Sequence, residues 1–222
     1  MLFQTFDDKE KCGTLYAKER LYFDKHPSKL TKTWSYSEFL IDKNIEYAQL
    51  YCRGQKLDQV CPDYLRKEWD KVNNKLKAFV RSFQLSKVSL DDNCFYDMVP
   101  KKFLLEYCEI RNRITKHVFA NFLPVQNLRF LTSLTKLVGD ISQQKLNIDL
   151  EGFKPFLAEH RAREWRKKIK NIPPYIKYDI FGTKTGRLTT KKNSFPILTL
   201  DKGYRNILKP NNDWFVELDY NA

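Results

Sequence analysis

The residues best suited to metal chemistry lie at the end of the sequence, where Asp219 directly follows the apolar run W-F-V-E-L of residues 214–218. A run of this composition predicts a buried strand. A carboxylate at the end of a strand is held on a rigid element, which is what a metal ligand requires. The sequence therefore predicts that Asp219 binds a metal ion.

Two segments upstream carry side chains that suit nucleic acid. The first is T-G-R-L, residues 185–188, in which Gly186 permits a tight turn and Arg187 presents a planar fork of donors to phosphate or base edges. The second is G-Y-R-N-I-L-K-P, residues 203–210, which contributes Arg205. Both segments place cationic donors close in sequence to the predicted metal ligand.

The order of these segments resembles that of the family A DNA polymerases, the group of bacterial DNA polymerase I and its phage and organelle relatives. The palm subdomain of that family opens with T-G-R-L, continues through a basic R-x-I segment and reaches a strand ending in D-Y-S, the first catalytic motif. The matching positions here are residues 185–188, residues 205–207, and Asp219-Tyr220 with Asn221 in the place of the serine. Three motifs in this order are more specific than any one alone.

This resemblance implies a DNA-directed DNA polymerase that adds deoxynucleotides to a DNA primer by two-metal nucleotidyl transfer. Asp219 would bind both Mg²⁺ ions, and the carbonyl of Tyr220 would bind one of them. Thr185 and Arg187 would hold the primer–template duplex, and Arg205 would hold template phosphate or brace the palm. Further DNA contacts are expected from nearby cations: Arg166, Lys167, Lys184, Lys191 and Lys192.

The same resemblance implies partners besides primer–template DNA. A deoxynucleoside triphosphate is the expected second substrate. The fingers lysine and the second catalytic aspartate of the family would follow Ala222, so a C-terminal polymerase half is expected to complete the site. The short segment before T-G-R-L is typical of a phage-like member, which implies the cytoplasm of an infected host cell.

The charge of the chain favours the same class of partner. The sequence has 40 Lys and Arg against 27 Asp and Glu, a net charge of +13, and residues 161–222 alone hold 14 basic against 6 acidic residues. Such an excess favours nucleic acid, although a basic soluble protein without that partner has the same composition. With 42% hydrophobic and 14% aromatic residues, the chain is expected to fold into one or two domains.

The cysteines and the hydropathy of the sequence indicate the cellular compartment in which the protein is expected. An odd number of cysteines without a C-x-x-C pair predicts reduced intracellular thiols. Buried free thiols are favoured over a zinc site that also uses His117, because the spacing of the residues is irregular. No apolar run approaches the length of a membrane span, so no membrane partner is expected. The cysteines concerned are Cys12, Cys52, Cys61, Cys94 and Cys108.

The N-terminal part of the chain is expected to be rich in strands. Alternation of apolar and polar residues predicts strands within residues 2–6, 14–23 and 45–52. Asp8 and Glu10 spell D-x-E after the first of these, which is the metal-binding motif of the 3′–5′ exonucleases that accompany many family A polymerases. A charged, exposed turn explains the same residues, and no Y-x-x-x-D motif follows. We therefore expect no working nuclease.

After this region the apolar residues recur at a spacing that is typical of α-helices. Spacings of three and four predict one helix from Pro62, a second from Pro100 and a third from about Asn127, with Pro124 separating the last two. The apolar faces of these helices are expected to form core rather than binding grooves.

Residues 141–171 resemble the entry to the thumb of the family. The piece I-x-x-x-x-L-N-I-D-L includes Asp149, a suitable cap for the helix that follows. Two interpretations of this basic helix stay open: a reduced thumb that grips duplex DNA, and a solvated helix end whose cations interact favourably with the helix dipole. Its cations are Arg161, Arg163, Arg166, Lys167, Lys168 and Lys170.

We therefore expect an α+β chain in three parts. These are a mixed α/β domain at 1–125, degenerate exonuclease-like or of another kind, a helical thumb-like segment at 126–172, and the start of a polymerase palm with antiparallel strands at 173–222. The expected function is the N-terminal part of a family A DNA polymerase. A non-catalytic basic DNA-binding module, identified by salt-sensitive binding alone, and a 3′–5′ exonuclease-like domain, identified by metal-dependent degradation of single strands, are the alternatives.

Overall fold

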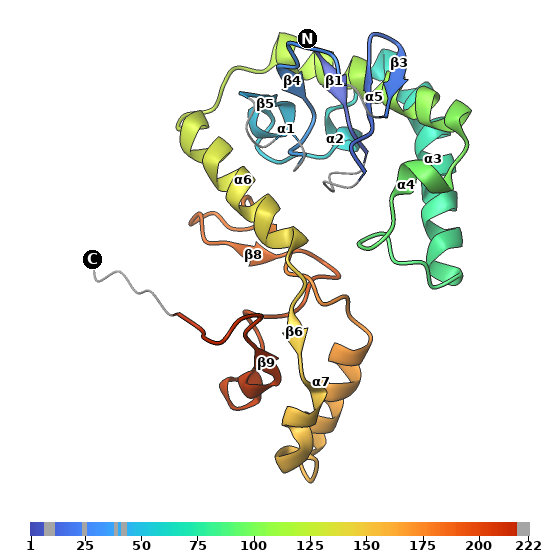
Figure 1. Ribbon diagram of the computed structural model, residues 1–222. Coiled ribbons are helices and arrows are strands. Elements are labelled where there is room, and N and C mark those ends of the chain that lie inside the picture. The colour runs from blue at the N-terminus through green and yellow to red at the C-terminus, as the bar shows by residue number, and fades with distance from the viewer. Residues whose placement is uncertain (7–11, 24–25, 38–39, 41–43, 217–222) are drawn as a thin grey trace. The chain divides into compact units, whose positions relative to one another are not determined.

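The computed structural model of the chain describes residues 1–6, 12–23, 26–37, 40 and 44–216. Contacts divide the chain into two compact units, residues 1–139 and 140–222, and the boundary falls within helix α6 (Leu128–Gln143). Helices and small sheets together give a mixed α and β structure (Figure 1), in agreement with the predicted class. The finer division into three domains stays a prediction. Among the residues described, none of the helices combines the length and apolar character needed to cross a membrane.

The first unit begins with short strands and continues with helices. Its strands are β1 (Phe3–Gln4), β2 (Leu15–Ala17), β3 (Arg20–Tyr22), β4 (Lys32–Thr33) and β5 (Glu46–Tyr47). Its helices before α6 are α1 (Ala48–Tyr51), α2 (Leu57–Val60), α3 (Asp63–Leu85), α4 (Phe95–Met98) and α5 (Lys101–Asn121). Strands β1, β2 and β3 form an antiparallel sheet in that order, and β4 pairs with β5 in parallel. The β2–β3 hairpin confirms the prediction of strands within residues 14–23.

The core of the first unit forms where α3 and α5 pack together and α5 packs against β1 and β2 (Figure 1). Pro62 and Pro100 directly precede the first residues of α3 and α5, so both predicted helix starts are confirmed. Burying a large apolar side chain contributes about 1.5–3 kcal/mol, which makes this contact the main support of the unit. The buried side chains of the two helices include Leu65, Trp69, Val72, Phe103, Leu104, Ile110, Ile114 and Val118.

The predicted strand at residues 45–52 is wrong beyond Tyr47, because the chain turns there into α1. Ala48, Leu50 and Tyr51 are all buried. A helical turn that contacts α5 can bury these three side chains, whereas an alternating strand with one solvated face cannot.

The prediction that all cysteines are free thiols is wrong for Cys12 and Cys94, which form a disulfide. The two residues are 82 positions apart in the sequence, yet their Cα atoms are 5.7 Å apart, within the span of a disulfide. Phe6 stacks on Phe95 with ring centroids 3.9 Å apart, so packing after β1 brings this part of the chain to the start of α4. The remaining cysteines are free and buried: Cys52, Cys61 and Cys108.

The second unit is built of short elements. They are β6 (Asn147–Ile148), the 3₁₀ helix η2 (Leu150–Phe156), α7 (His160–Lys170), β7 (Tyr178–Asp179), β8 (Thr189–Thr190), the 3₁₀ helix η3 (Lys202–Ile207) and β9 (Leu208–Lys209). Strand β6 pairs with β9 and β7 with β8, both antiparallel. The Asp149 carboxylate accepts a 2.9 Å hydrogen bond from the Glu151 N–H, so the predicted cap is confirmed, although it begins η2 and not the basic helix α7.

The core of the second unit joins η2, α7 and η3. Phe195 links the β7–β8 hairpin to this core, because its side chain is fully buried while its N–H donates a 2.9 Å hydrogen bond to the Tyr175 carbonyl. Helix α7 ends at Lys170, three residues before Pro173, which cannot continue a helix. The buried residues of this core are Phe153, Ala162, Ile169, Phe195, Leu200, Tyr204 and Ile207.

The predicted buried strand at residues 214–218 is wrong for the residues that the structure describes. Trp214, Phe215 and Val216 belong to no strand and are 83%, 68% and 81% exposed. Consecutive apolar side chains of an extended segment point to both of its faces, so they form a stable strand only between neighbours that cover both. No described strand pairs with this segment.

Candidate nucleic-acid interface

The T-G-R-L segment lies in the loop of the β7–β8 hairpin. Tyr178 pairs with Thr190 and Asp179 with Thr189, and the Lys191 N–H extends the ladder with a 2.7 Å hydrogen bond to the Lys177 carbonyl. The loop between the strands spans residues 180–188. The segment that was expected to hold the primer–template duplex is therefore part of a hairpin loop.

Hydrogen bonds within the loop hold its shape. The Asp179 carboxylate accepts a 2.9 Å hydrogen bond from the Phe181 N–H, which begins the turn. The Thr183 hydroxyl donates a 2.9 Å hydrogen bond to the Arg187 carbonyl across the loop. Gly186 has φ +76°, a conformation that favours glycine, so the predicted tight turn is confirmed. The loop thus has a defined path that keeps the Arg187 side chain outside.

Gly182 marks a second place where the loop needs a small residue. A Cβ atom added there would overlap the side chain of Thr189 on β8. The backbone at Gly182 therefore lies directly on the strand, and this close approach fixes the base of the loop.

The cations of the hairpin are exposed and have no ion pair or hydrogen bond from their side chains to any described residue. A cation in this state keeps its full capacity for phosphate oxygens, which form most contacts in protein–DNA interfaces. Thr185 is also exposed, and its hydroxyl lies 3.4 Å from that of Thr183. The cations concerned are Lys184, Arg187, Lys191 and Lys192.

Helix α7 carries its cations on the side away from the core. Ala162 and Ile169 are buried and Trp165 is half-buried, whereas the basic residues of the helix are exposed. Lys167 and Lys170 have no side-chain partner among the described residues. Both stand in the last turn, where a cation also interacts favourably with the helix dipole.

The other cations of α7 have partners inside the second unit. Arg161 lies 3.3 Å from Asp201, and Arg166 lies 4.0 Å from Glu151. Arg163 donates to the carbonyls of residues 157 and 158, and Lys168 lies over the Trp165 ring. These four side chains help to hold the unit together, so the predicted DNA contact at Arg166 is already engaged, whereas that at Lys167 is free among the described residues.

Arg205 is exposed on η3 and has no side-chain partner among the described residues. Its helix is anchored by Tyr204, whose hydroxyl donates a 2.8 Å hydrogen bond to the Glu159 carboxylate. That hydrogen bond raises the pKa of Tyr204. The Asp201 carboxylate caps the helix by accepting from the Gly203 N–H at 3.1 Å. Arg205 is therefore held on a braced element and is available to a phosphate.

Two contributors to the interface were not predicted from the sequence. Thr183 closes the loop from inside, and its only signal is the T-x-T spacing with Thr185. Glu159 positions η3 by accepting a hydrogen bond from Tyr204. The two residues are 45 positions apart in the sequence, so no local pattern predicts their contact. Lys170 was part of the predicted basic run without being singled out.

The predicted metal ligands Asp219 and Tyr220 lie outside the described residues, as do Asp8 and Glu10 of the D-x-E motif. In the part of the chain that the structure describes, no group of three or more His, Cys, Asp or Glu could hold a metal ion.

No protein-family model, curated protein or solved structure matches this chain.

Proposed function

We propose that this chain is the N-terminal part of a family A DNA polymerase and that its second unit holds the primer–template duplex. The observation that carries the proposal is a set of exposed cations with no partner among the described residues, on elements braced by the core. They include Lys167, Lys170, Lys184, Arg187, Lys191, Lys192 and Arg205.

Cations in this state bind DNA mainly by releasing counterions. Each phosphate neutralised by Lys or Arg releases condensed cations from the duplex, so affinity falls steeply with salt. Arg187 adds a planar fork that matches two phosphate oxygens, whereas the lysines act as point charges. Because the loop is fixed by Thr183 and Asp179, little ordering accompanies binding.

In the proposed reaction the primer 3′ hydroxyl loses its proton to solvent and its oxygen forms a bond to the α-phosphorus of the incoming deoxynucleotide, while the bond from that phosphorus to the bridging oxygen of the leaving pyrophosphate breaks. Bound Mg²⁺ ions supply activation of that hydroxyl and stabilisation of the leaving phosphate. Asp219 and the Tyr220 carbonyl would hold them. Arg187 and Thr185 hold the duplex so that the primer end stays in place, and a C-terminal palm and fingers polypeptide contributes the remaining site.

A second function is favoured by one observation. Trp214, Phe215 and Val216 are exposed and outside any strand, so the element that would carry Asp219 is not built from the described residues. A basic DNA-binding module without catalysis needs the same exposed cations and no palm strand.

Primer extension separates the two functions. The chain is mixed with a C-terminal palm and fingers polypeptide of a family A polymerase, and nucleotide incorporation is measured with Mg²⁺. We expect extension, a loss on the order of a thousandfold in Asp219→Asn because a ligand shared by both ions loses its charge, and weaker DNA binding with unchanged Mg²⁺ dependence in Arg187→Ala. Binding without extension identifies the non-catalytic module, and near-normal turnover of Asp219→Asn contradicts the assignment of this residue.

A further inference from the structure

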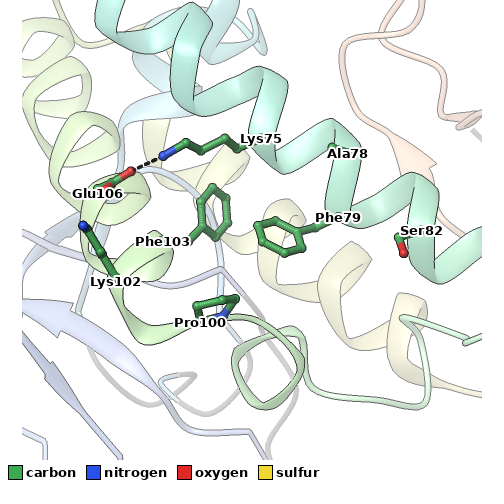
Figure 2. Close-up of a pocket in the computed structure, with 8 residues that line it drawn as sticks. All are labelled: Lys75, Ala78, Phe79, Ser82, Pro100, Lys102, Phe103 and Glu106. Atoms are coloured by element: carbon green, nitrogen blue, oxygen red, sulfur yellow. Dashed lines mark hydrogen bonds and ion pairs between the residues drawn. The ribbon is translucent and has the colours of Figure 1, made fainter.

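The first unit has a groove of about 600 Å³ between α3 and α5. Figure 2 shows the rings of Phe79 and Phe103 pointing toward each other in it, and their centroids are 4.9 Å apart. Phe79 is half-buried and Phe103 is buried, and the small side chains of Ala78 and Ser82 on α3 lie beside them, so the floor of the groove is apolar. The remaining lining residues are Lys75, Pro100, Lys102 and Glu106.

Two ion pairs join α3 to α5 along the line where these helices pack together, which we call the seam, on one side of the groove. Glu68 lies 2.6 Å from Arg113, and Lys75 lies 2.8 Å from Glu106. The second pair stands at the edge of the groove (Figure 2). Both pairs bridge α3 and α5 along a seam where buried apolar side chains pack the two helices together.

The rim of the groove has a surplus of positive charge. Its only carboxylate among the described lining residues is Glu106, which faces lysines on both helices. The hydrogen bond from Lys75 lowers the pKa of Glu106, and the charges of Lys102 and Lys71 lower it further. Lys102 has no ion pair among the described residues. It also stands in the first turn of α5, which has no acidic residue, at the positive end of the helix dipole.

We propose that this groove binds a small amphipathic anion, with its apolar body on Phe79 and Phe103 and its anionic head at Lys102. The volume lies within the range of small-molecule sites, which combine an apolar lining with a few polar groups that orient the ligand. The apolar floor selects a hydrocarbon or aryl body, and the cationic rim selects an anion over a neutral or cationic analogue. The site belongs to the first unit and does not rest on the proposed DNA binding.

The test uses three probes with the same eight-carbon chain: octanoate, octan-1-ol and octylammonium. Binding to the intact chain is measured by saturation-transfer NMR and titration calorimetry. We expect octanoate to bind about 1.4-fold to fivefold more tightly than the alcohol, since an exposed charge interaction contributes roughly 0.2–1 kcal/mol, and octylammonium to bind most weakly. Equal affinity of the alcohol and the acid, or no binding of octanoate at millimolar concentration, overturns the proposal.

Two matched pairs of variants locate the site. Ala78→Glu places a carboxylate in the groove from an exposed helical position, and we expect at least a tenfold loss of octanoate affinity. Gln84→Glu makes the same charge change on an exposed part of α3 outside the lining and should have little effect. Lys102→Gln should weaken octanoate about threefold and leave octan-1-ol unchanged, whereas Lys101→Gln should not. Unchanged octanoate binding in Ala78→Glu, or equal losses within either pair, places binding elsewhere and contradicts the proposal.

Discussion

The α3–α5 seam of the first unit and the β7–β8 hairpin of the second unit use their cations in different ways. In the first unit, basic residues of the helices pair with carboxylates of other elements, as Lys75 does with Glu106 and Arg113 with Glu68. In the second, the cations of the hairpin loop project without partners among the described residues. The first arrangement stabilises a fold, and the second keeps charge available to a polyanion.

The hydrophobic cores of the two units also differ, in the number of residues that they bury. Among the described residues, the core cluster of the first unit joins 20 buried residues and that of the second joins 7. Long helices with a large buried interface resist local opening, whereas short 3₁₀ helices and two-residue strands open more easily. We therefore expect the second unit to have a small free energy of unfolding. Each of its core residues should contribute a larger fraction of that free energy than a core residue of the first unit does.

The largest effect is expected from Phe153→Ala. Phe153 is fully buried in the second core, and truncating a buried phenylalanine costs about 3–5 kcal/mol. We expect hydrogen exchange to show loss of protection throughout the described part of the second unit, with α3 and α5 still protected. Leu104→Ala, in the larger core, is the matched change and should leave the second unit protected. Equal loss of protection in both units by Phe153→Ala would show that their stabilities are not separate.

The next effect is expected from the disulfide, which belongs to the first unit. Cys12–Cys94 closes a loop of 82 residues, and a link of this length stabilises a fold by about 4 kcal/mol through the unfolded state. Cys94→Ser should lower the free energy of unfolding of the first unit by about that amount in urea. A reductant should destabilise the parent chain and leave Cys94→Ser unchanged. A parent chain that is insensitive to reductant would contradict a stabilising disulfide.

A smaller effect is expected at the base of the hairpin loop. Gly182→Ala forces the added methyl against Thr189, and overpacking of this kind costs about 1–3 kcal/mol. We expect faster hydrogen exchange at residues 178–190 and weaker DNA binding. Gly203→Ala is the control, because its added Cβ meets only the Asp201 carboxylate at an ordinary 3.7 Å. Similar exchange in both variants would show that the loop does not depend on this close approach.

The smallest effect is expected at the Lys75–Glu106 pair. The pair is exposed, so Glu106→Gln should change the free energy of unfolding by less than about 1 kcal/mol. Because Lys75 lowers the pKa of Glu106 in the folded chain, the contribution is present at neutral pH and is lost as the pH falls below the ordinary glutamate range through that lowered pKa. Urea unfolding at pH 7 and pH 3 should therefore differ less in Glu106→Gln than in the parent. An unchanged difference would show that the pair contributes nothing.

Local sequence patterns predicted the long helices correctly. They failed for short segments whose secondary structure is decided by tertiary contacts. Proline followed by a three-and-four apolar period predicted α3 and α5 well, since each helix carries its own signal. The pattern in residues 45–52 predicted a strand, yet burial against α5 turned half of it into α1. The apolar run at 214–216 predicted a strand whose neighbours the described residues do not supply.

The sequence predicted which residue types form the candidate interface. It predicted less well which of these cations are free to contact a phosphate. Lys184, Arg187 and Arg205 were predicted as DNA contacts and are exposed. Arg166 was predicted in the same way, but it faces Glu151, 15 positions away and on another element. A cation in a sequence does not reveal its carboxylate partner, because that partner is brought near by folding alone.

The most direct test of DNA binding by the second unit is the salt dependence of its affinity for a primer–template duplex. Two fourfold Gln variants remove equal charge, and we measure log Kd against log salt for each by fluorescence anisotropy. The first variant changes Lys184, Arg187, Lys191 and Lys192. The second changes exposed cations of the first unit, Lys67, Lys77, Arg81 and Lys116.

Each lost phosphate contact reduces the magnitude of the salt slope by about 0.9, so the first variant should reduce it by about three to four. The second variant should keep the slope and most of the affinity of the parent. An equal reduction in both variants would show binding by net charge alone, and a reduction in the second variant only would place the interface in the first unit.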